Sequence, residues 1–128
     1  MIQAYFAQIK VELDRYTSAN FVLDASINFE TRPGNQGLVS GHVLFIDGSR
    51  FFFREYLDAL AENVDKLLYS YHYQDSKDQL IFRYDNALHQ PTLNFQEHKH
   101  TPPDQIEYAI SPTITDTLAE IAIQQGWV

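Results

Sequence analysis

Four of the chain's five histidines lie within the thirty residues from Tyr71 to His100, among cationic and acidic side chains. Histidine titrates near neutral pH and is the commonest metal ligand, so this density predicts a functional site. The candidate site residues are His72, Arg83, Asp85, His89, His98, Lys99 and His100.

Cleavage of RNA is one chemistry that these side chains can support. Attack by the strand's own 2′-hydroxyl requires a base, an acid and a cation near the phosphate. His89, His98 and His100 are candidate acid–base groups. Arg83 and Lys99 are candidate phosphate ligands. The cluster therefore predicts a ribonuclease-like activity with RNA as substrate.

A metal site is a second interpretation. On a strand, His98-Lys99-His100 would point both imidazoles to one side and Lys99 to the other. With Asp85 or His89 as a further ligand, this H-x-H pair is suited to a divalent metal.

A third interpretation gives the cluster no chemistry. Arg83 would then pair with Asp85 or Glu55 across a sheet. The histidines would form the interface of a non-catalytic binding module for a protein or a small ligand. His42, far from the cluster in sequence, is predicted to be a structural or surface residue.

Strand register decides whether His72 joins the cluster. In the strand ending at Tyr84, alternation places Arg83 and Asp85 on the face opposite the apolar side chains. A four-residue loop over 75–78 would put His72 on the Arg83 face, and an odd-length loop would put it on the Phe82 face. Both registers stay open.

The elements that position these residues follow from changes in apolar spacing. A helix is predicted over 2–16, where apolar residues recur every three or four positions, and a second helix from Ser111 as N-cap to Gly126. Period-two patterns and turn residues predict the strands between them. These strands cover 21–30, 38–46, 51–56, 67–73 and 79–84, with extended segments within 93–100 and 106–110. Residues 57–68 have helical spacing, but they also fit a short helical turn followed by the start of a strand.

The predicted fold class is therefore α+β. We expect an antiparallel β-meander of about five to six strands, with the N- and C-terminal helices packed on one face. The length predicts one domain over residues 1–128.

Composition limits the classes of function. The absence of cysteine excludes disulfides, thiolate nucleophiles and cysteine-ligated zinc. A net charge of −8 argues against nucleic-acid binding through a broad basic surface, although not through a local cationic site. No signal-peptide pattern and no membrane-spanning apolar stretch occurs, which predicts a cytoplasmic protein without membrane contact. A homo-oligomer remains open.

Three strings resemble the TumE family, the toxin components of bacterial and archaeal toxin–antitoxin pairs. They are Tyr71–Asp75 (YHYQD), Leu80–Ala87 (LIFRYDNA) and His98–His100 (HKH). The residues that match the family's pattern are His72, Arg83, Asp85, Asn86, His89, Pro91, His98, Lys99 and His100. The resemblance implies a cognate antitoxin as partner. This chain departs from the pattern at Leu88, where the family has Pro, and at Gln90 and Glu97, where it has His.

Overall fold

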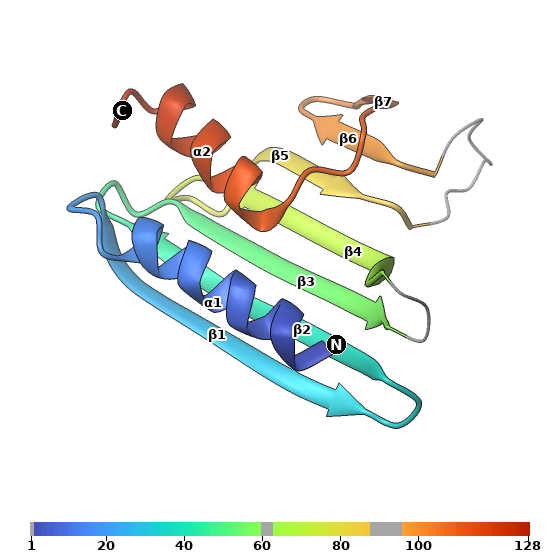
Figure 1. Ribbon diagram of the computed structural model, residues 1–128. Coiled ribbons are helices and arrows are strands. Elements are labelled where there is room, and N and C mark those ends of the chain that lie inside the picture. The colour runs from blue at the N-terminus through green and yellow to red at the C-terminus, as the bar shows by residue number, and fades with distance from the viewer. Residues whose placement is uncertain (1, 60–62, 88–95) are drawn as a thin grey trace.

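The computed structural model describes residues 2–59, 63–87 and 96–128, which form a seven-stranded antiparallel sheet and two helices (Figure 1). In chain order the elements are α1 (Ile2–Thr17), β1 (Val22–Arg32), β2 (Gln36–Phe45), β3 (Arg50–Asp58), β4 (Asp65–Gln74), β5 (Leu80–Asp85), β6 (His98–Thr101), β7 (Gln105–Tyr108) and α2 (Ile114–Gln124). No helix in these ranges is long and apolar enough to cross a membrane.

The strands lie side by side in chain order, each antiparallel to the next. The α+β meander is confirmed, but the expected five to six strands are seven, because both extended segments near 98 and 106 pair as strands. Within 57–68, β3 runs to Asp58 and β4 starts at Asp65. A helix over the whole segment is therefore wrong, and residues 60–62 lie outside the described residues.

Both helices lie on the same face of the sheet, as Figure 1 shows and as the apolar spacing predicted. The buried stripe of α1 consists of Ile2, Phe6, Ile9 and Leu13. In α2 the buried residues are Ile114, Thr117, Leu118, Ile121 and Ala122.

The start of α2 differs from the prediction of Ser111 as N-cap. Thr113 is the N-cap, because its hydroxyl accepts from the Asp116 backbone N–H at 3.0 Å. The Asp116 carboxylate in turn accepts from the Thr113 N–H at 3.1 Å, which completes a capping box. Gly126 ends the helix as predicted, with φ of 74°, and Trp127 N–H reaches back to the Ala122 carbonyl.

Alternation along β1 breaks at Leu23. Period two over the predicted strand 21–30 would place Leu23 on the same face as Phe21, but its side chain is 63% exposed. The register of β1 against β2 shifts between Val22 and Asp24. Such a bulge inserts one extra residue, which turns Leu23 away from the core.

The sheet therefore has two chemically different faces. The face under the helices carries the core, including Phe51, Phe53, Tyr71, Tyr73 and Phe82, all at most 3% exposed. Residues at the alternate positions point to the other side, which we call the open face. The open face carries the polar and cationic side chains of β3 to β6.

A buried polar network joins α1 and the α2 entry to the helix-covered face. Glu55, 1% exposed, accepts hydrogen bonds from Tyr5 of α1 at 2.7 Å and from Tyr71. Lys66 donates to the Tyr71 hydroxyl at 2.8 Å and to the Pro112 carbonyl at 2.7 Å. Each buried charge in this network has hydrogen-bond partners. Removing one partner would leave another buried polar group unsatisfied, which costs the desolvation free energy of that group.

We predict that Tyr71→Phe changes how stability depends on alkaline pH. Burial, and then the Glu55 carboxylate, raises the pKa of Tyr71 above its ordinary value near 10. The unfolded chain thus releases this proton first, and wild type loses stability as pH rises past about 10. The substitution should lower the free energy of unfolding by roughly 1–3 kcal/mol near neutral pH.

Urea unfolding at pH 8 and pH 11 measures this effect. The difference in the free energy of unfolding between Tyr71→Phe and wild type should be smaller at pH 11. Burial lowers the pKa of Lys66, so this group makes stability rise with pH, and it does so in both proteins. Tyr16→Phe removes a hydroxyl outside this network and is the control. A Tyr71→Phe difference that stays constant with pH would contradict the predicted proton retention.

Candidate functional site

The β4–β5 register places His72 directly opposite Arg83. Gln74 pairs with Leu80, so five residues lie between the paired ends, and an odd loop alone would bring His72 opposite Phe82. The register then shifts by one residue between Gln74 and Tyr73, because Tyr73 pairs with Phe82 and not with Ile81. The extra residue at Ile81 restores His72 to the Arg83 face.

Five side chains form a row across the open face, one from each of five adjacent strands. Pairing runs from His42 to Phe52, from Phe52 to His72, from His72 to Arg83, and from Arg83 to His100. Neighbouring strands are about 4.8 Å apart, so His72 and His100 flank Arg83 on either side. Three imidazoles and one guanidinium therefore share one surface, and two of these imidazoles flank the guanidinium.

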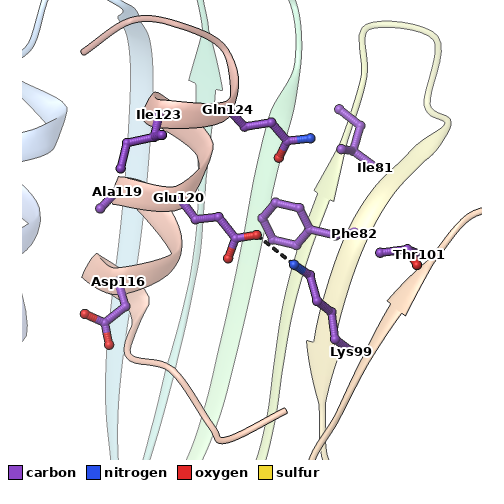
Figure 2. Close-up of a pocket in the computed structure, with 9 residues that line it drawn as sticks. All are labelled: Ile81, Phe82, Lys99, Thr101, Asp116, Ala119, Glu120, Ile123 and Gln124. Atoms are coloured by element: carbon purple, nitrogen blue, oxygen red, sulfur yellow. Dashed lines mark hydrogen bonds and ion pairs between the residues drawn. The ribbon is translucent and has the colours of Figure 1, made fainter. Parts of the chain in front are cut away.

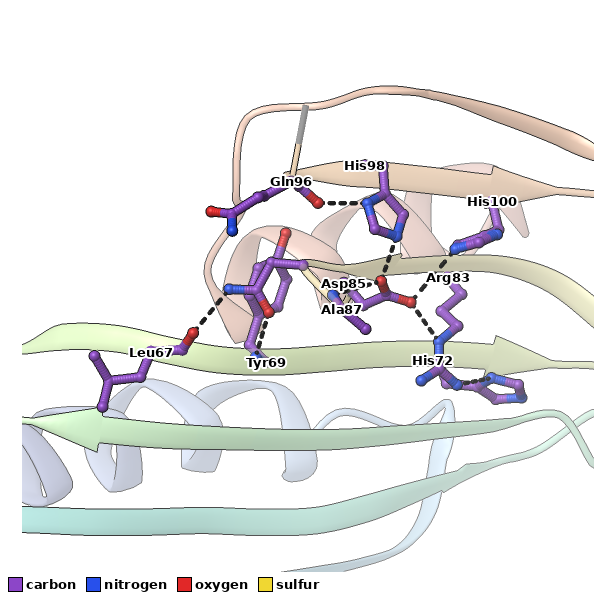
Figure 3. Close-up of polar contacts among 10 residues, drawn as sticks. Leu67, Tyr69, His72, Arg83, Asp85, Ala87, Gln96, His98 and His100 are labelled. Atoms are coloured by element: carbon purple, nitrogen blue, oxygen red, sulfur yellow. Dashed lines mark hydrogen bonds and ion pairs between the residues drawn. The ribbon is translucent and has the colours of Figure 1, made fainter. Parts of the chain in front are cut away.

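Asp85 lies beside this row and holds its members. Its carboxylate accepts from Arg83 Nε at 2.7 Å and from the Ala87 N–H at 3.2 Å. It also contacts His98 Nε2, and His100 Nε2 lies 3.5 Å from Oδ2 (Figure 3). The side chain is only 5% exposed, so donors replace the water that the charge has lost. Asp85 thus fixes the orientation of Arg83 and His100.

The end of β5 is clamped to β4 by Asn86. Its side-chain oxygen accepts from the Tyr69 N–H at 3.0 Å, and its amide donates to the Leu67 carbonyl at 3.1 Å. These two bonds continue the contacts between β4 and β5 past Asp85. Asn86 consequently sets the position at which the chain leaves the site.

His98 is completely buried. Its Nδ1 faces the Gln96 carbonyl, and its Nε2 faces Asp85. Both ring nitrogens therefore face oxygen acceptors inside the protein. A substrate on the open face cannot reach this ring, so its position suits orienting Asp85 better than transferring a proton to RNA.

His72 is half-buried on the open face. Its Nδ1 lies 3.4 Å from Arg83 Nη1, and its Nε2 lies 3.0 Å from the Gln74 side-chain oxygen. Arginine has only donors, which assigns the hydrogen to Nε2 and a lone pair to Nδ1. Burial lowers the pKa of His72, the bond to Gln74 opposes this, and the charge of Arg83 lowers the pKa further. The neutral ring is a proton acceptor.

The spacing of Asp85, His98 and His100 also matches the expected metal ligands. Their candidate ligand atoms all lie within 4.8 Å of one another. A shared divalent ion would replace the direct contact between His98 and Asp85. The carbonyl at Nδ1 would leave Nε2 as the donor atom, as is usual for metal-bound histidine.

Lys99 lies on the opposite side of the sheet from this cluster. Its Nζ binds Glu120 of α2 at 2.8 Å and lies 5.0 Å and 4.9 Å from the ring centres of Phe82 and Tyr84 (Figure 2). Strand alternation produces this separation from His98 and His100. The structure therefore does not bring Lys99 together with the other candidates, and its contacts anchor α2.

His89, Leu88 and Gln90 lie outside the described residues. Glu97, which stands where the family pattern has His, has one carboxylate oxygen buried without a hydrogen bond to the described residues.

Sequence analysis did not select two residues of the open face, because the stretch Phe51–Tyr56 carries one Arg and one Glu, which indicates too little charge for a nucleic-acid surface. Arg54 and Phe52 come from β3, far from the histidine cluster in sequence, and register brings them beside Ser70 and His72. Alternation within the string RFFFREY could have indicated that both leave the core.

We predict that Asp85→Asn destabilises the protein by about 3 kcal/mol or more. An amide keeps the size but leaves Arg83 and the imidazoles without the carboxylate, as when one member of a buried charge pair is removed. Urea unfolding at neutral pH measures this loss. Asp104→Asn, in the exposed β6–β7 turn, is the matched control. Equal stability of both variants would show that Asp85 does not hold the cluster together.

Comparison with known families supports the resemblance noted in the three strings. The family model described as "Toxin TumE" matches residues 11–125, which span α1 to α2. Searches of curated proteins and of solved structures find no match. A toxin family implies a cognate antitoxin. The match covers nearly the whole chain and includes every strand of the sheet, so this protein belongs to the TumE toxin family.

Proposed function

We propose that this protein is a toxin that cleaves RNA on the open face of its sheet. The observation that carries the proposal is the row in which Arg83 lies between His72 and His100 on adjacent strands. A cation between two imidazoles can supply the base, the acid and the positive charge that 2′-hydroxyl attack on a phosphate requires.

Each of these three residues has a distinct role in this reaction. Neutral His72 takes the proton of the 2′-hydroxyl at Nδ1, where this contact replaces the one to Arg83 Nη1, and the hydroxyl oxygen then bonds to phosphorus. Arg83 stabilises the negative charge that develops on the phosphate oxygens. His100 gives a proton to the 5′-oxygen as its bond to phosphorus breaks, which leaves a 2′,3′-cyclic phosphate and a 5′-hydroxyl.

Asp85 and His98 act behind this row as positioning residues. Asp85 contacts Arg83, His98 and His100, whereas the burial of His98 keeps it from the substrate. Lys99, first considered as a phosphate ligand, has no part in the proposed reaction because it lies on the helix-covered face.

Local charge offsets the acidic character of the whole chain at this surface. The chain carries a net −8, yet the centre of the open face carries Arg54 and Arg83, and the carboxylate among them is buried and bonded. A phosphate therefore meets cations there. Glu30 of β1, which pairs with Leu38 in the register, forms an ion pair with Arg32.

We predict that His72→Gln and Arg83→Gln each slow RNA cleavage by about 10²–10⁴-fold and relieve growth arrest on expression of the chain without antitoxin. The variants retain hydrogen-bonding groups but lose the acid–base nitrogen or the charge. Arg32→Gln removes an arginine at the exposed end of β1 and should leave cleavage unchanged. Unfolding curves verify that all three variants are folded.

A chelator separates this reaction from metal-assisted cleavage. Acid–base catalysis by these residues should continue in EDTA, whereas a metal at Asp85, His98 and His100 would make cleavage depend on added divalent ion. A wild-type chain that neither arrests growth nor cuts RNA, with or without metal, would refute the proposed activity. The same surface would then be a non-catalytic binding site.

A further inference from the structure

We infer that the open face binds single-stranded RNA with one phosphate between Arg54 and Arg83 and with the two flanking bases in separate hollows. The inference names the substrate class of the proposed nuclease, and it rests on that function for the nature of the ligand. It is carried by two adjoining hollows, the side chains that line them and two arginines that both hollows share.

The two hollows meet at the centre of the open face. One has a volume of about 490 Å³ and the other about 400 Å³. Arg54, Ser70 and Arg83 line both. A ligand that fills both hollows must therefore cross these three residues, and a phosphodiester linkage is the anionic segment that suits a crossing with two guanidinium groups.

The first hollow offers an aromatic surface. Phe52 is 38% exposed although it lies in the middle of β3. The rings of His42 and His72 lie on its two sides, with ring centres 6.3 Å and 6.1 Å from that of Phe52. An exposed aromatic ring between imidazoles provides a stacking surface for one nucleobase.

The second hollow is mainly apolar. Leu38, Tyr56 and Leu68 form a paired row across β2, β3 and β4, and all three line it. Leu68 is 57% exposed, which is unusual for leucine in a central strand. The hollow can therefore cover the face of a second base without demanding a particular pattern of donors.

The two arginines differ in how they are held. Arg83 is oriented by Asp85, as described above. For Arg54, no hydrogen bond or ion pair is found among residues 2–59, 63–87 and 96–128, and its side chain lines both hollows. Ser70 of β4 pairs with Arg54 on one side and with Asp85 on the other, and Asp85 binds Arg83. A phosphate above Ser70 would therefore be within reach of both guanidinium groups.

Single-stranded RNA fits this surface better than a duplex does. A base can enter either hollow only when its face is unstacked and its partner is absent. Stacking also accepts every base, which predicts binding with little sequence preference. What the two arginines require of a ligand is the anionic linkage between the two bases.

Binding can be measured without cleavage by using a fluorescent 2′-O-methyl RNA oligonucleotide, which lacks the attacking hydroxyl. Wild type should bind it as a single strand at least tenfold more tightly than as an annealed duplex. Phe52→Thr should weaken single-strand binding by roughly 5- to 150-fold, the contribution of one stacked base. Arg54→Gln should lower the slope of log affinity against log salt by about 0.7.

Two substitutions serve as controls. Leu23→Thr replaces an apolar side chain of β1 that is 63% exposed, more than the 38% of Phe52, and Arg32→Gln removes an arginine at the far edge of the sheet. Both should bind within twofold of wild type. Circular dichroism verifies that every variant is folded.

The outcomes separate this inference from the proposed catalysis. Equal binding of duplex and single strand, no binding at low salt, or equal effects of Phe52→Thr and Leu23→Thr would overturn the inference. Phe52-dependent binding without cleavage of unmodified RNA would support it while refuting the nuclease. Cleavage that is unchanged in Phe52→Thr would leave the nuclease standing and overturn the inference.

Discussion

The buried carboxylate of Asp85 is the interaction on which the open face depends. It lies near the end of β5, accepts from Arg83, and contacts both histidines of β6. Through Arg83 its influence reaches His72 on β4. A buried charge is tolerated only when donors surround it, so the need to satisfy Asp85 also orders the cation and imidazoles around it. One electrostatic requirement therefore gives the candidate site its geometry.

The two faces of the sheet separate stability from chemistry. Under the helices, a second set of buried polar groups links Tyr5, Glu55, Lys66 and Tyr71, and Lys99 binds α2 through Glu120. On the open face, the groups near Arg54 and Arg83 line hollows that a ligand can enter. Substitutions on the helix-covered face, and of the buried Asp85, should mainly alter folding, whereas substitutions of exposed open-face residues such as Phe52 should mainly alter binding.

Local sequence patterns predicted the elements of this fold because helices and strands have fixed periods. They also predicted that Arg83 and Asp85 share a face. Register could not be predicted, since His72 joins that face only because a bulge at Ile81 compensates an odd loop. A bulge likewise exposes Leu23. Phe52 and Arg54 were missed because pairing between β3 and β4 brings them to the site, and this pairing leaves no local pattern.

A chemical-shift titration tests most directly the claim that substrate binds the open face. Amide and side-chain signals of the folded protein are followed while a short single-stranded 2′-O-methyl RNA is added. The account predicts that the largest shifts belong to His72, Arg83 and Ser70, with little change at Lys99 and Glu120 on the opposite face. Shifts centred on Lys99 and α2, or no shifts at all, would contradict it.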